Sequence, residues 1–364
     1  MGTRTVKYNK ESNLAFSETL KKRVDYYFEI NNKEKTGGKE IFLKAIILLT
    51  LGFTTYGLII YYLSSGYILI PLILNFFMGF TLAGIGFNVM HDASHKSFSE
   101  KSWVNNLMLL TLELMGACSV FWVIKHVFLH HSFVNIEELD DDIQAGVFFR
   151  MGPEQPLKWF HSYIQKYWPT VIFFYSLLYI YWVWGNDFRK YFKRKIHNYE
   201  IPEKKFTFQM HFVFWFSKII YFFWTIVLPW IVSDLGTAVL CYLVMAGTTG
   251  IVIALVFQLA HIVEASKFTK SVKGEMPHSW EEQQLFETIN FQTDSKILRF
   301  YIGGLNHQIE HHLFPNISHV HYHKIQPIVE RTCKEFGLPY VNLSLPKATK
   351  SHFLKLRQLS EKSD

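Results

Sequence analysis

Three short motifs in the sequence gather histidines at spacings that suit a metal site. They are H-D-A-S-H with His91 and His95, H-V-F-L-H-H with His126, His130 and His131, and Q-I-E-H-H with His311 and His312. Residues i, i+3 and i+4 share one face of a helix, so the imidazoles of each motif can reach a common ion. His261, in Q-L-A-H-I-V-E, is a further candidate ligand. One such motif would be weak support, whereas the set predicts a metal centre.

The number of these histidines predicts two metal ions rather than one. A structural zinc ion takes four ligands and a catalytic one three, so the eight imidazoles can supply two ions with positions left open. Imidazole binds iron, zinc, copper and nickel. Open positions beside a membrane favour iron that activates O2, with two zinc ions as an alternative. Eight unrelated imidazoles are a further alternative. We disfavour it because ionisable groups near a bilayer are costly and usually functional.

Ligating imidazoles usually donate their second ring N–H to a carboxylate, a backbone carbonyl or water. The sequence offers these candidates for that role close to the motifs: Asp92, Asn135, Asp140, Asp142, Glu264 and Glu310. Asp92 and Glu310 are favoured because they lie inside the motifs. For residues 140–142, a solvated acidic turn is the alternative interpretation.

The elements that must position these residues are membrane-spanning helices. Hydrophobic residues make up 49% of the chain and charged residues only 18%, against about 25% in globular proteins. A span needs about 20 mainly apolar residues. The segments 41–63, 67–89, 212–232 and 236–260 meet this requirement. Short turns without Lys or Arg, 64–66 and 233–235, join them into two helical hairpins.

The basic residues predict how the hairpins are oriented. The stretch 189–205 is rich in Lys and Arg, and both ends of the chain are basic. The positive-inside rule places these parts in the cytoplasm, so the net charge of +7 reflects membrane topology and not nucleic-acid binding. The first 40 residues are polar, so we expect no signal peptide. Cys118, Cys241 and Cys333 show no CxxC spacing and are expected to be free thiols in a reducing compartment.

Two more apolar runs, 105–123 and 170–184, lie between the histidine motifs and the basic stretch. If either spanned the bilayer alone, the motifs would fall on opposite sides of the membrane. We therefore expect both to be re-entrant or interfacial. Near the N-terminus, Phe16, Leu20, Val24 and Phe28 recur at helical spacing. They predict an amphipathic helix on the membrane surface or on the cytoplasmic cap.

Together these features predict an all-α integral membrane protein with four transmembrane helices in two hairpins and a cytoplasmic helical cap holding a di-iron site. The expected organisation is a cytoplasmic amphipathic segment at 1–40, a membrane domain at 41–340 and a cytoplasmic C-terminal tail at 341–364.

The motifs also resemble those of a known family. H-D-A-S-H, H-V-F-L-H-H-S-F-V-N and G-G-L-N-H-Q-I-E-H-H-L-F-P resemble the three histidine boxes of membrane fatty-acid desaturases. Gln308, in place of the first His of the third box, resembles the front-end group, which inserts a double bond between an existing one and the carboxyl end. Trp280, Gln284, Thr288 and Asn290–Phe291 match the stretch before that box. The resemblance runs from the N-terminal amphipathic stretch to about Tyr340.

The resemblance implies a ligand set, a cofactor and partners. The family's ligands correspond to His91, His95, His126, His130, His131, His261, His311 and His312, with Gln308 at a ninth position. The implied cofactor is two non-haem iron ions, with O2 as co-substrate. The implied substrate is a fatty acyl-CoA or an acyl-lipid. His307 is expected to support a ligand from outside the metal's own ligand set or to be unrelated to the site, whereas the later His319, His321 and His323 are expected to be interfacial or cap histidines.

The family also bears on the electron source and the location. The H-P-G-G motif of a fused cytochrome b-type domain is absent from the sequence, and the N-terminal segment is too short for that domain. We therefore expect a separate donor, a ferredoxin or a cytochrome b type with its reductase. Bacterial members are similar in this respect, which favours a bacterial inner membrane with both termini in the cytoplasm.

Two other functions fit parts of the pattern. A hydroxylase acting on a lipid or carotenoid uses the same kind of metal site, but the Q-I-E-H-H box favours a desaturase. A metal-binding membrane protein without catalysis, such as a transporter, predicts ionisable groups deep in the spans. Only Lys44, Glu113 and Lys218 fall within apolar runs, while the candidate ligands gather at the ends of the spans.

Overall fold

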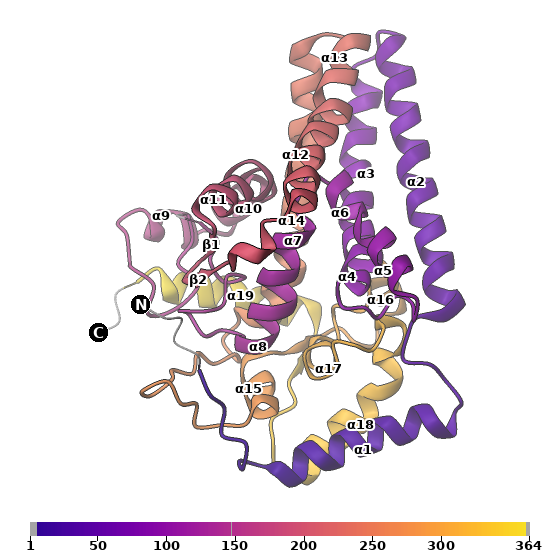
Figure 1. Cartoon of the computed structure of the whole chain (residues 1–364). Helices are drawn as coiled ribbons and strands as arrows, with labels where there is room; N and C mark the ends of the chain where they lie inside the picture. Colours follow the sequence, from indigo (N-terminus) through magenta and orange to yellow (C-terminus); the bar gives the residue numbers. More distant parts are fainter. Residues whose placement is uncertain (1–5, 147, 362–364) are drawn as a thin grey trace.

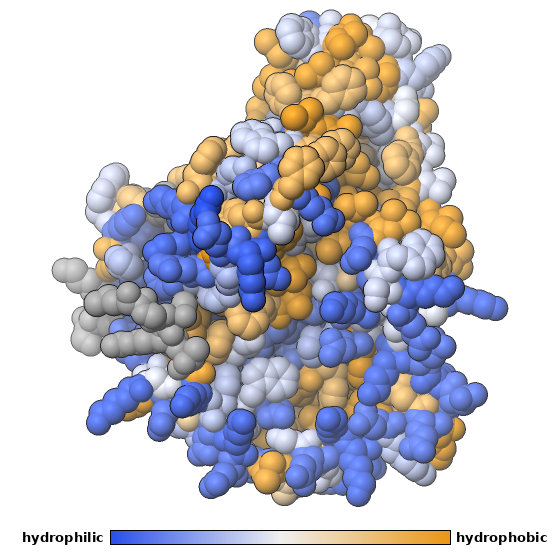
Figure 2. Space-filling model, in the orientation of Figure 1, coloured by the Kyte–Doolittle hydropathy of each residue, from blue (hydrophilic) through white to orange (hydrophobic). Residues whose placement is uncertain are grey.

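The computed structural model describes residues 6–146 and 148–361 of the chain. Long apolar helices project from one side of the molecule, and shorter helices and loops form a cap at their other end (Figure 1). Figure 2 shows hydrophobic surface over the projecting helices and mostly hydrophilic surface over the cap. The outermost residues of the expected N-terminal segment and tail, 1–5 and 362–364, lie outside the described residues.

The prediction of four spans in two hairpins is confirmed. Four helices are long and apolar enough to cross a membrane: Gly38–Ser64, Leu69–Ser94, Phe208–Val232 and Leu235–His261. The first is α2 (Gly38–Ser64) and the last is α14 (Leu235–His261). The second comprises α3 (Leu69–Ile85), the π-helical η1 (Gly86–Met90) and α4 (His91–Ser94). The third comprises α12 (Phe208–Phe222), the π-helical η5 (Phe223–Val227) and α13 (Leu228–Val232).

The first additional apolar run forms a sharply bent pair of helical segments. The segments Ser102–Leu114 and Ser119–Phe133 meet at an angle of 108°, as in a broken span or a re-entrant loop. They contain α5 (Ser102–Leu109), α6 (Thr111–Leu114), α7 (Ser119–Trp122), the π-helical η2 (Val123–His130) and α8 (His131–Phe133). The backbone N–H of Ser119 donates to Glu113 Oε1 at 3.0 Å across the bend, which gives the carboxylate in this apolar run a structural role.

The second run does not add a span among the described residues. It forms α10 (Trp168–Ile180) and the π-helical η3 (Tyr181–Asn186), between α9 (His161–Gln165) and α11 (Asp187–Lys193). In Figure 1, α10 lies beside the bundle and out of line with the long helices. It packs closely on α14, where a Cβ added to Gly250 would come within 2.6 Å of the Tyr175 carbonyl oxygen.

The cap is built from helices near both ends of the chain. They are α1 (Leu14–Ile30), η4 (Glu203–Lys205), α15 (Trp280–Glu287), α16 (Lys296–Tyr301), α17 (Gln308–Leu313), η6 (His319–His321), α18 (Tyr322–Glu335) and α19 (Leu345–Leu359). Two small sheets join them: antiparallel β1 (Lys195–Ile196) with β2 (Tyr199–Glu200), and parallel β3 (Asn290–Phe291) with β4 (Asn342–Leu343). The expected apolar stripe of α1 is buried against α17 and α18, so α1 belongs to the cap.

The expected C-terminal tail is packed into the protein as far as it is described. His352 of α19 is buried between a span and α10, with Nδ1 at 2.7 Å from the Ile262 carbonyl oxygen and Nε2 at 2.7 Å from the Tyr175 hydroxyl. Leu356 and Leu359 are buried in the same apolar cluster. The basic composition of the segment led to the prediction of a tail. One face of α19 is nevertheless buried, so the segment is part of the fold.

Gly79 allows the closest approach of the two hairpins. A Cβ at this position would lie 2.6 Å from Thr248 Cβ and 2.7 Å from the Met245 carbonyl oxygen, so α3 and α14 would have to separate. We expect Gly79→Ala to destabilise the protein by about 1–3 kcal/mol through overpacking. Thermal unfolding in detergent measures this. Gly57→Ala is the matched control, because nothing lies within 4 Å of its added Cβ. Equal unfolding midpoints for the two variants would contradict the prediction.

Candidate metal centre

All the candidate histidines meet at one end of the spans. His91 begins α4, His95 follows it, and His261 is the last residue of α14. His126 and His130 lie in η2, His131 begins α8, and α17 carries His311 and His312. All eight residues are at least 96% buried. Two of the contributing elements, η1 before His91 and η2 itself, are π-helical, a rare geometry that is frequent at functional sites.

The imidazoles separate into two groups that could each hold an ion. One ring nitrogen from each of His91, His95, His126 and His311 lies within 4.8 Å of the others, and the same holds for His130, His261 and His312. His131 lies between the groups, with its ring centre 4.6 Å from that of His95 and 4.5 Å from those of His311 and His312. His126 and His130, whose spacing would let them share an ion, fall in different groups of histidines, but they also form a third set with Asp142 whose ligand atoms lie within 4.8 Å of one another.

The ring nitrogens fit a metal centre. Among the described residues, no hydrogen-bond partner reaches either nitrogen of His95 and His131, or Nε2 of His130, His261, His311 and His312. Buried polar atoms without partners are rare and need an explanation, which metal coordination provides. Burial and neighbouring imidazoles lower the pKa of His311 and His312 well below the usual value. Both rings are therefore neutral, the form that has a lone pair to offer a metal.

Four of the rings are oriented by side chains at Nδ1. Asp142 Oδ2 lies 2.8 Å from His126 Nδ1, and Asp140 Oδ2 lies 2.9 Å from His130 Nδ1. Both carboxylates were expected near the cluster. Two neutral partners were not expected in this role: Gln284 Oε1 lies 2.8 Å from His312 Nδ1, and the Tyr322 hydroxyl lies 3.0 Å from His311 Nδ1. Gln284 could have been found from its place in the stretch before the third box, whereas Tyr322 carried no such signal.

The acidic segment 140–142 is a buried charge network and not a solvated turn. Lys125 Nζ lies 3.0 Å from Asp142 Oδ1, and Lys190 Nζ lies 2.7 Å from Asp141 Oδ2. Burial opposes ionisation of Asp142, but Lys125 and His130 outweigh it and hold the pKa of this carboxyl well below its usual range. Asp142 is thus an anion that can orient the His126 ring.

Asp92 and Glu264 do not contact the rings of the candidate ligands. Asp92 Oδ1 lies 2.9 Å from His319 Nδ1, and its Oδ2 accepts a hydrogen bond from the Ser318 hydroxyl at 2.6 Å. Although Asp92 follows His91, the next residue on a helix points about 100° away, which turns its carboxylate toward η6. Glu264 is exposed and accepts a hydrogen bond from Gln358 Nε2 at 3.1 Å, because the chain leaves α14 at His261 and turns to the surface.

Asn135 and Glu310 are buried near the cluster but serve the surrounding backbone and cap. Asn135 Nδ2 is 3.2 Å from the His261 carbonyl oxygen, so it holds the backbone of a candidate ligand and not its ring. Glu310 accepts hydrogen bonds from Asn290 Nδ2 and the Tyr340 hydroxyl, both at 2.8 Å. Burial raises the pKa of Glu310 to about 7. The carboxylate therefore ties α17 to β3 and not to a ring.

Gln308 is buried on α17 with the two histidines of the third box, at positions i, i+3 and i+4. No hydrogen-bond partner among the described residues reaches its Nε2. Its neighbour His307 precedes α17, with Nδ1 at 3.8 Å from Glu310 Oε2, and is absent from both histidine groups. Gln308 thus lies on the same turn of α17 as His311 and His312, and His307 lies outside both histidine groups.

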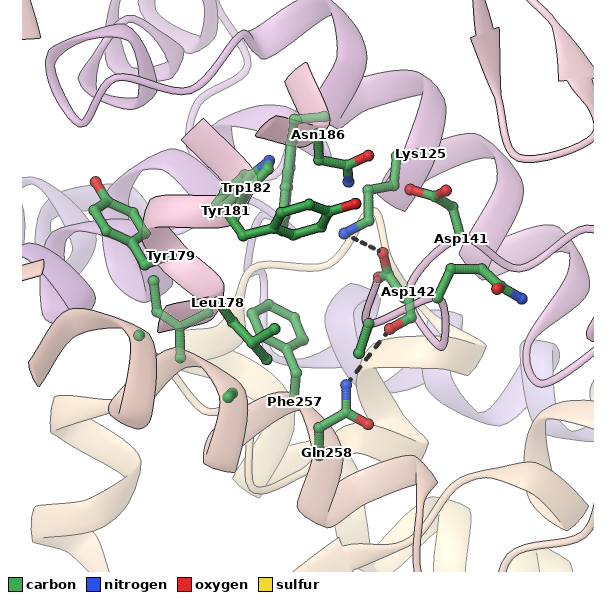
Figure 3. Close-up of a pocket in the computed structure, with 16 residues that line it drawn as sticks. Lys125, Asp141, Asp142, Leu178, Tyr179, Tyr181, Trp182, Asn186, Phe257 and Gln258 are labelled. Atoms are coloured by element: carbon green, nitrogen blue, oxygen red, sulfur yellow. Dashed lines mark hydrogen bonds and ion pairs between the residues drawn. The ribbon is translucent and has the colours of Figure 1, made fainter. Parts of the chain in front are cut away.

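A cavity of about 120 Å³, whose lining residues are drawn in Figure 3, shares a wall with the centre. Trp122 stacks on His126 at 4.5 Å between ring centres, and the ring centre of Phe257 lies 5.6 Å from that of His126. Leu178 and Trp182 line the same cavity, while Lys125 and Asp142 form its polar end. An apolar chain lying there would be held against the first histidine group.

The fold and site have clear counterparts among known proteins. The model of the fatty acid desaturase family matches residues 39–344. An acyl-lipid (8-3)-desaturase of Physcomitrium patens is 34% identical over 98% of this chain and 74% of that protein. An sn-1 linoleoyl-lipid 6-desaturase of Arthrospira platensis is 31% identical over 93% of this chain and 91% of that protein. A similar 6-desaturase of Synechocystis is 30% identical over 89% of each chain.

A helical membrane protein with histidine groups at one end of its spans is thus matched along most of its length by lipid-modifying enzymes. The chain belongs to the fatty acid desaturase family and is an enzyme that desaturates fatty acids.

Proposed function

We propose that the two histidine groups bind two iron ions and that the protein uses O2 to insert a double bond into the acyl chain of a membrane lipid. The observation that carries this proposal is the set of buried ring nitrogens without hydrogen-bond partners among the described residues. His91, His95, His126 and His311 would hold one ion, and His130, His261 and His312 the other. We assign His131 and Gln308 to the remaining ligand positions, because His131 lies between the groups and Gln308 is buried on the α17 face that carries His311 and His312.

Bound iron supplies the oxidising chemistry that side chains cannot, the removal of hydrogen from unactivated C–H bonds. Two hydrogens leave adjacent methylenes, and with O2, two electrons and two protons they form two water molecules. The side chains of the protein position the ligands and the substrate. Asp140 and Asp142 orient His130 and His126 through Nδ1, and Gln284 does the same for His312. Trp122 and Phe257 form the apolar wall between the cavity and His126.

The cavity and the relatives support a proposal for the substrate and for the position of the new bond. The cavity of about 120 Å³ is smaller than ordinary ligand pockets of about 300–1,000 Å³, so an acyl chain must extend beyond it. Relatives named acyl-lipid (8-3)-desaturase and linoleoyl-lipid 6-desaturase favour a lipid-linked substrate over acyl-CoA. Together with Gln308 in the third box, they favour front-end desaturation.

The basic stretch 189–205 supports placing the cap, both termini and the metal centre in the cytoplasm, in a bacterial inner membrane. Residues 41–340 would form the desaturase domain, with α1 and α19 completing its cap. Electrons would come from a separate ferredoxin or a cytochrome b type with its reductase.

Expression in a host supplied with defined fatty acids tests the reaction. Mapping of double bonds in the lipids should show a new bond on the carboxyl side of an existing one, formed only with O2. A hydroxylated product would favour the lipid hydroxylase. Metal uptake without any lipid product would favour a metal-binding protein without catalysis. A new double bond on the methyl side of the existing one would still identify a desaturase, but it would overturn the front-end assignment.

Asp140 offers a test of the ligand assignment. Asp140→Asn would replace a carboxylate, whose Oδ2 lies 2.9 Å from His130 Nδ1, with a neutral amide that has one acceptor oxygen where Asp140 has two. Loss of such a partner typically lowers metal affinity by about 10–100-fold. We expect a decrease of this size in iron affinity, measured by competition with a chelator. Glu264→Gln is the control, because Glu264 is exposed and contacts no ligand ring. Unchanged affinity in Asp140→Asn would contradict the assignment of His130.

A further inference from the structure

A second pocket, of about 230 Å³, lies where α2, α16, η6 and α18 meet. Its charged lining is strongly unbalanced, with Lys44, Lys296, Arg299 and Lys324 against the single carboxylate of Glu40. The pocket does not share lining residues with the cavity beside His126. It is therefore separate from the acyl-chain cavity and calls for an anionic ligand of its own.

The cations at the mouth of this pocket are not neutralised by the protein. Within the described residues, no carboxylate lies within 4.0 Å of the charged groups of Lys296, Arg299 or Lys324. His323 also lines the pocket, and its buried Nδ1 has no hydrogen-bond partner in the described part of the chain. Three unpaired cations and an unpartnered ring nitrogen are what a bound phosphate ester would satisfy.

The floor of the pocket is ordered by charged groups that are already paired. Lys44 is 5% exposed, and its Nζ lies 2.7 Å from His319 Nε2. An ammonium can only donate, so Nε2 accepts and the ring proton is on Nδ1, which lies 2.9 Å from Asp92 Oδ1. The negative charge of Asp92 thus offsets the positive charge of Lys44, with the His319 ring between them. The excess positive charge is left on Lys296, Arg299 and Lys324 at the mouth.

The pocket also has an apolar rim at the end of a span. Phe300 on α16 lines the pocket and is 48% exposed, and the chain neighbours of the lining residues Lys44 and Lys296, Leu43 and Ile297, are 60% and 86% exposed. α2 is one of the helices long enough to cross the membrane, so this rim faces the region where lipid head groups meet hydrocarbon. Basic pockets beside transmembrane helices commonly bind anionic head groups.

We propose that this pocket binds the phosphate of a membrane phospholipid, with Lys296, Arg299 and Lys324 contacting the phosphate and the apolar rim contacting the acyl chains. The site is independent of the iron centre and of the desaturation proposed above. A soluble phosphate ester such as coenzyme A offers the same phosphate but has no acyl chains for the rim, so the lipid is the better match.

Native mass spectrometry of the purified protein tests this proposal. The protein is released from liposomes that contain either phosphatidylglycerol or diacylglycerol in a neutral carrier lipid. Wild type should retain phosphatidylglycerol and not diacylglycerol, which lacks the phosphate. Lys296→Gln/Arg299→Gln/Lys324→Gln should retain at least about tenfold less phosphatidylglycerol, since each cation contributes about fivefold near an anionic surface. Lys193→Gln/Lys204→Gln/Lys205→Gln removes the same charge from exposed lysines outside the pocket and should lower retention clearly less than the pocket variant does.

Iron content and unfolding midpoint establish that each variant is folded. If the triple variant fails these checks, the single Arg299→Gln variant should still lower retention by about fivefold. Equal retention by wild type and the pocket variants would overturn the proposal. So would equal losses in the pocket and control variants, which would show surface attraction only. Binding of coenzyme A that depends on Lys296, Arg299 and Lys324, without retention of phospholipid, would identify a soluble phosphate ester instead.

Discussion

His311→Ala/His312→Ala is expected to abolish desaturation and to lower the iron content, because the two histidines serve different groups. His311 lies with His91, His95 and His126, whereas His312 lies with His130 and His261. The double variant therefore removes one imidazole from each ion. Each single variant should weaken one ion more than the other. Iron content per chain and the spectroscopic signal of the coupled ions measure this independently of turnover.

The matched control for this variant is His197→Ala/His278→Ala. Both residues lie in loops of the cap, outside the two histidine groups. Iron content and product formation should remain at the wild-type level. Full iron loading and unchanged double-bond formation in His311→Ala/His312→Ala would show that α17 contributes no ligands, and the proposed centre would have to be abandoned.

Lys218→Met is expected to produce the largest loss of stability, because it leaves a buried carboxylate without its cation. Lys218 Nζ lies 2.8 Å from Asp187 Oδ2 and donates to the Gly116 carbonyl oxygen at 2.5 Å. Both charged side chains are at most 3% exposed. Breaking a buried pair by removing one partner typically costs about 3–5 kcal/mol. Unfolding of the purified protein in detergent measures the effect.

A second substitution separates charge from packing. In Lys218→Met/Asp187→Asn the buried charge is gone, while the amide oxygen can still accept the hydrogen bond that the Cys118 N–H donates at 2.9 Å. We expect this double variant to recover most of the lost stability. If it is as unstable as Lys218→Met, the loss reflects packing and not an unpaired charge. Lys204→Met, at an exposed position, should have no effect.

The Lys218–Asp187 ion pair also shows what the sequence could not reveal about charged residues in apolar runs. Lys44, Glu113 and Lys218 were recognised as exceptions within those runs. The structure pairs Lys44 with His319, Glu113 with the backbone of Ser119, and Lys218 with Asp187. These partners are separated from them by 275, 6 and 31 residues. Sequence spacing identifies contacts within one helix, but only packing determines which distant element is adjacent.

The sequence by itself determined the spans and the end at which the histidines gather. Apolar length decides whether a helix can cross a bilayer, and the motifs fall at the ends of those lengths. Composition alone did not reveal that α19 is packed against Tyr175 and Ile262, because a short helix with one buried face looks like a polar tail.

Only the tertiary structure decided how the histidines divide between two groups and what orients them. Adjacent residues on a helix diverge by about 100°, so His311 and His312 turn to different groups although they are neighbours in the sequence. The same divergence turns Asp92 from the cluster toward His319. Tyr322 and Gln284 reach the rings from other helices of the cap. The way those helices pack determines which side chain lies next to each ring, and the spacing of residues along the chain does not predict this packing.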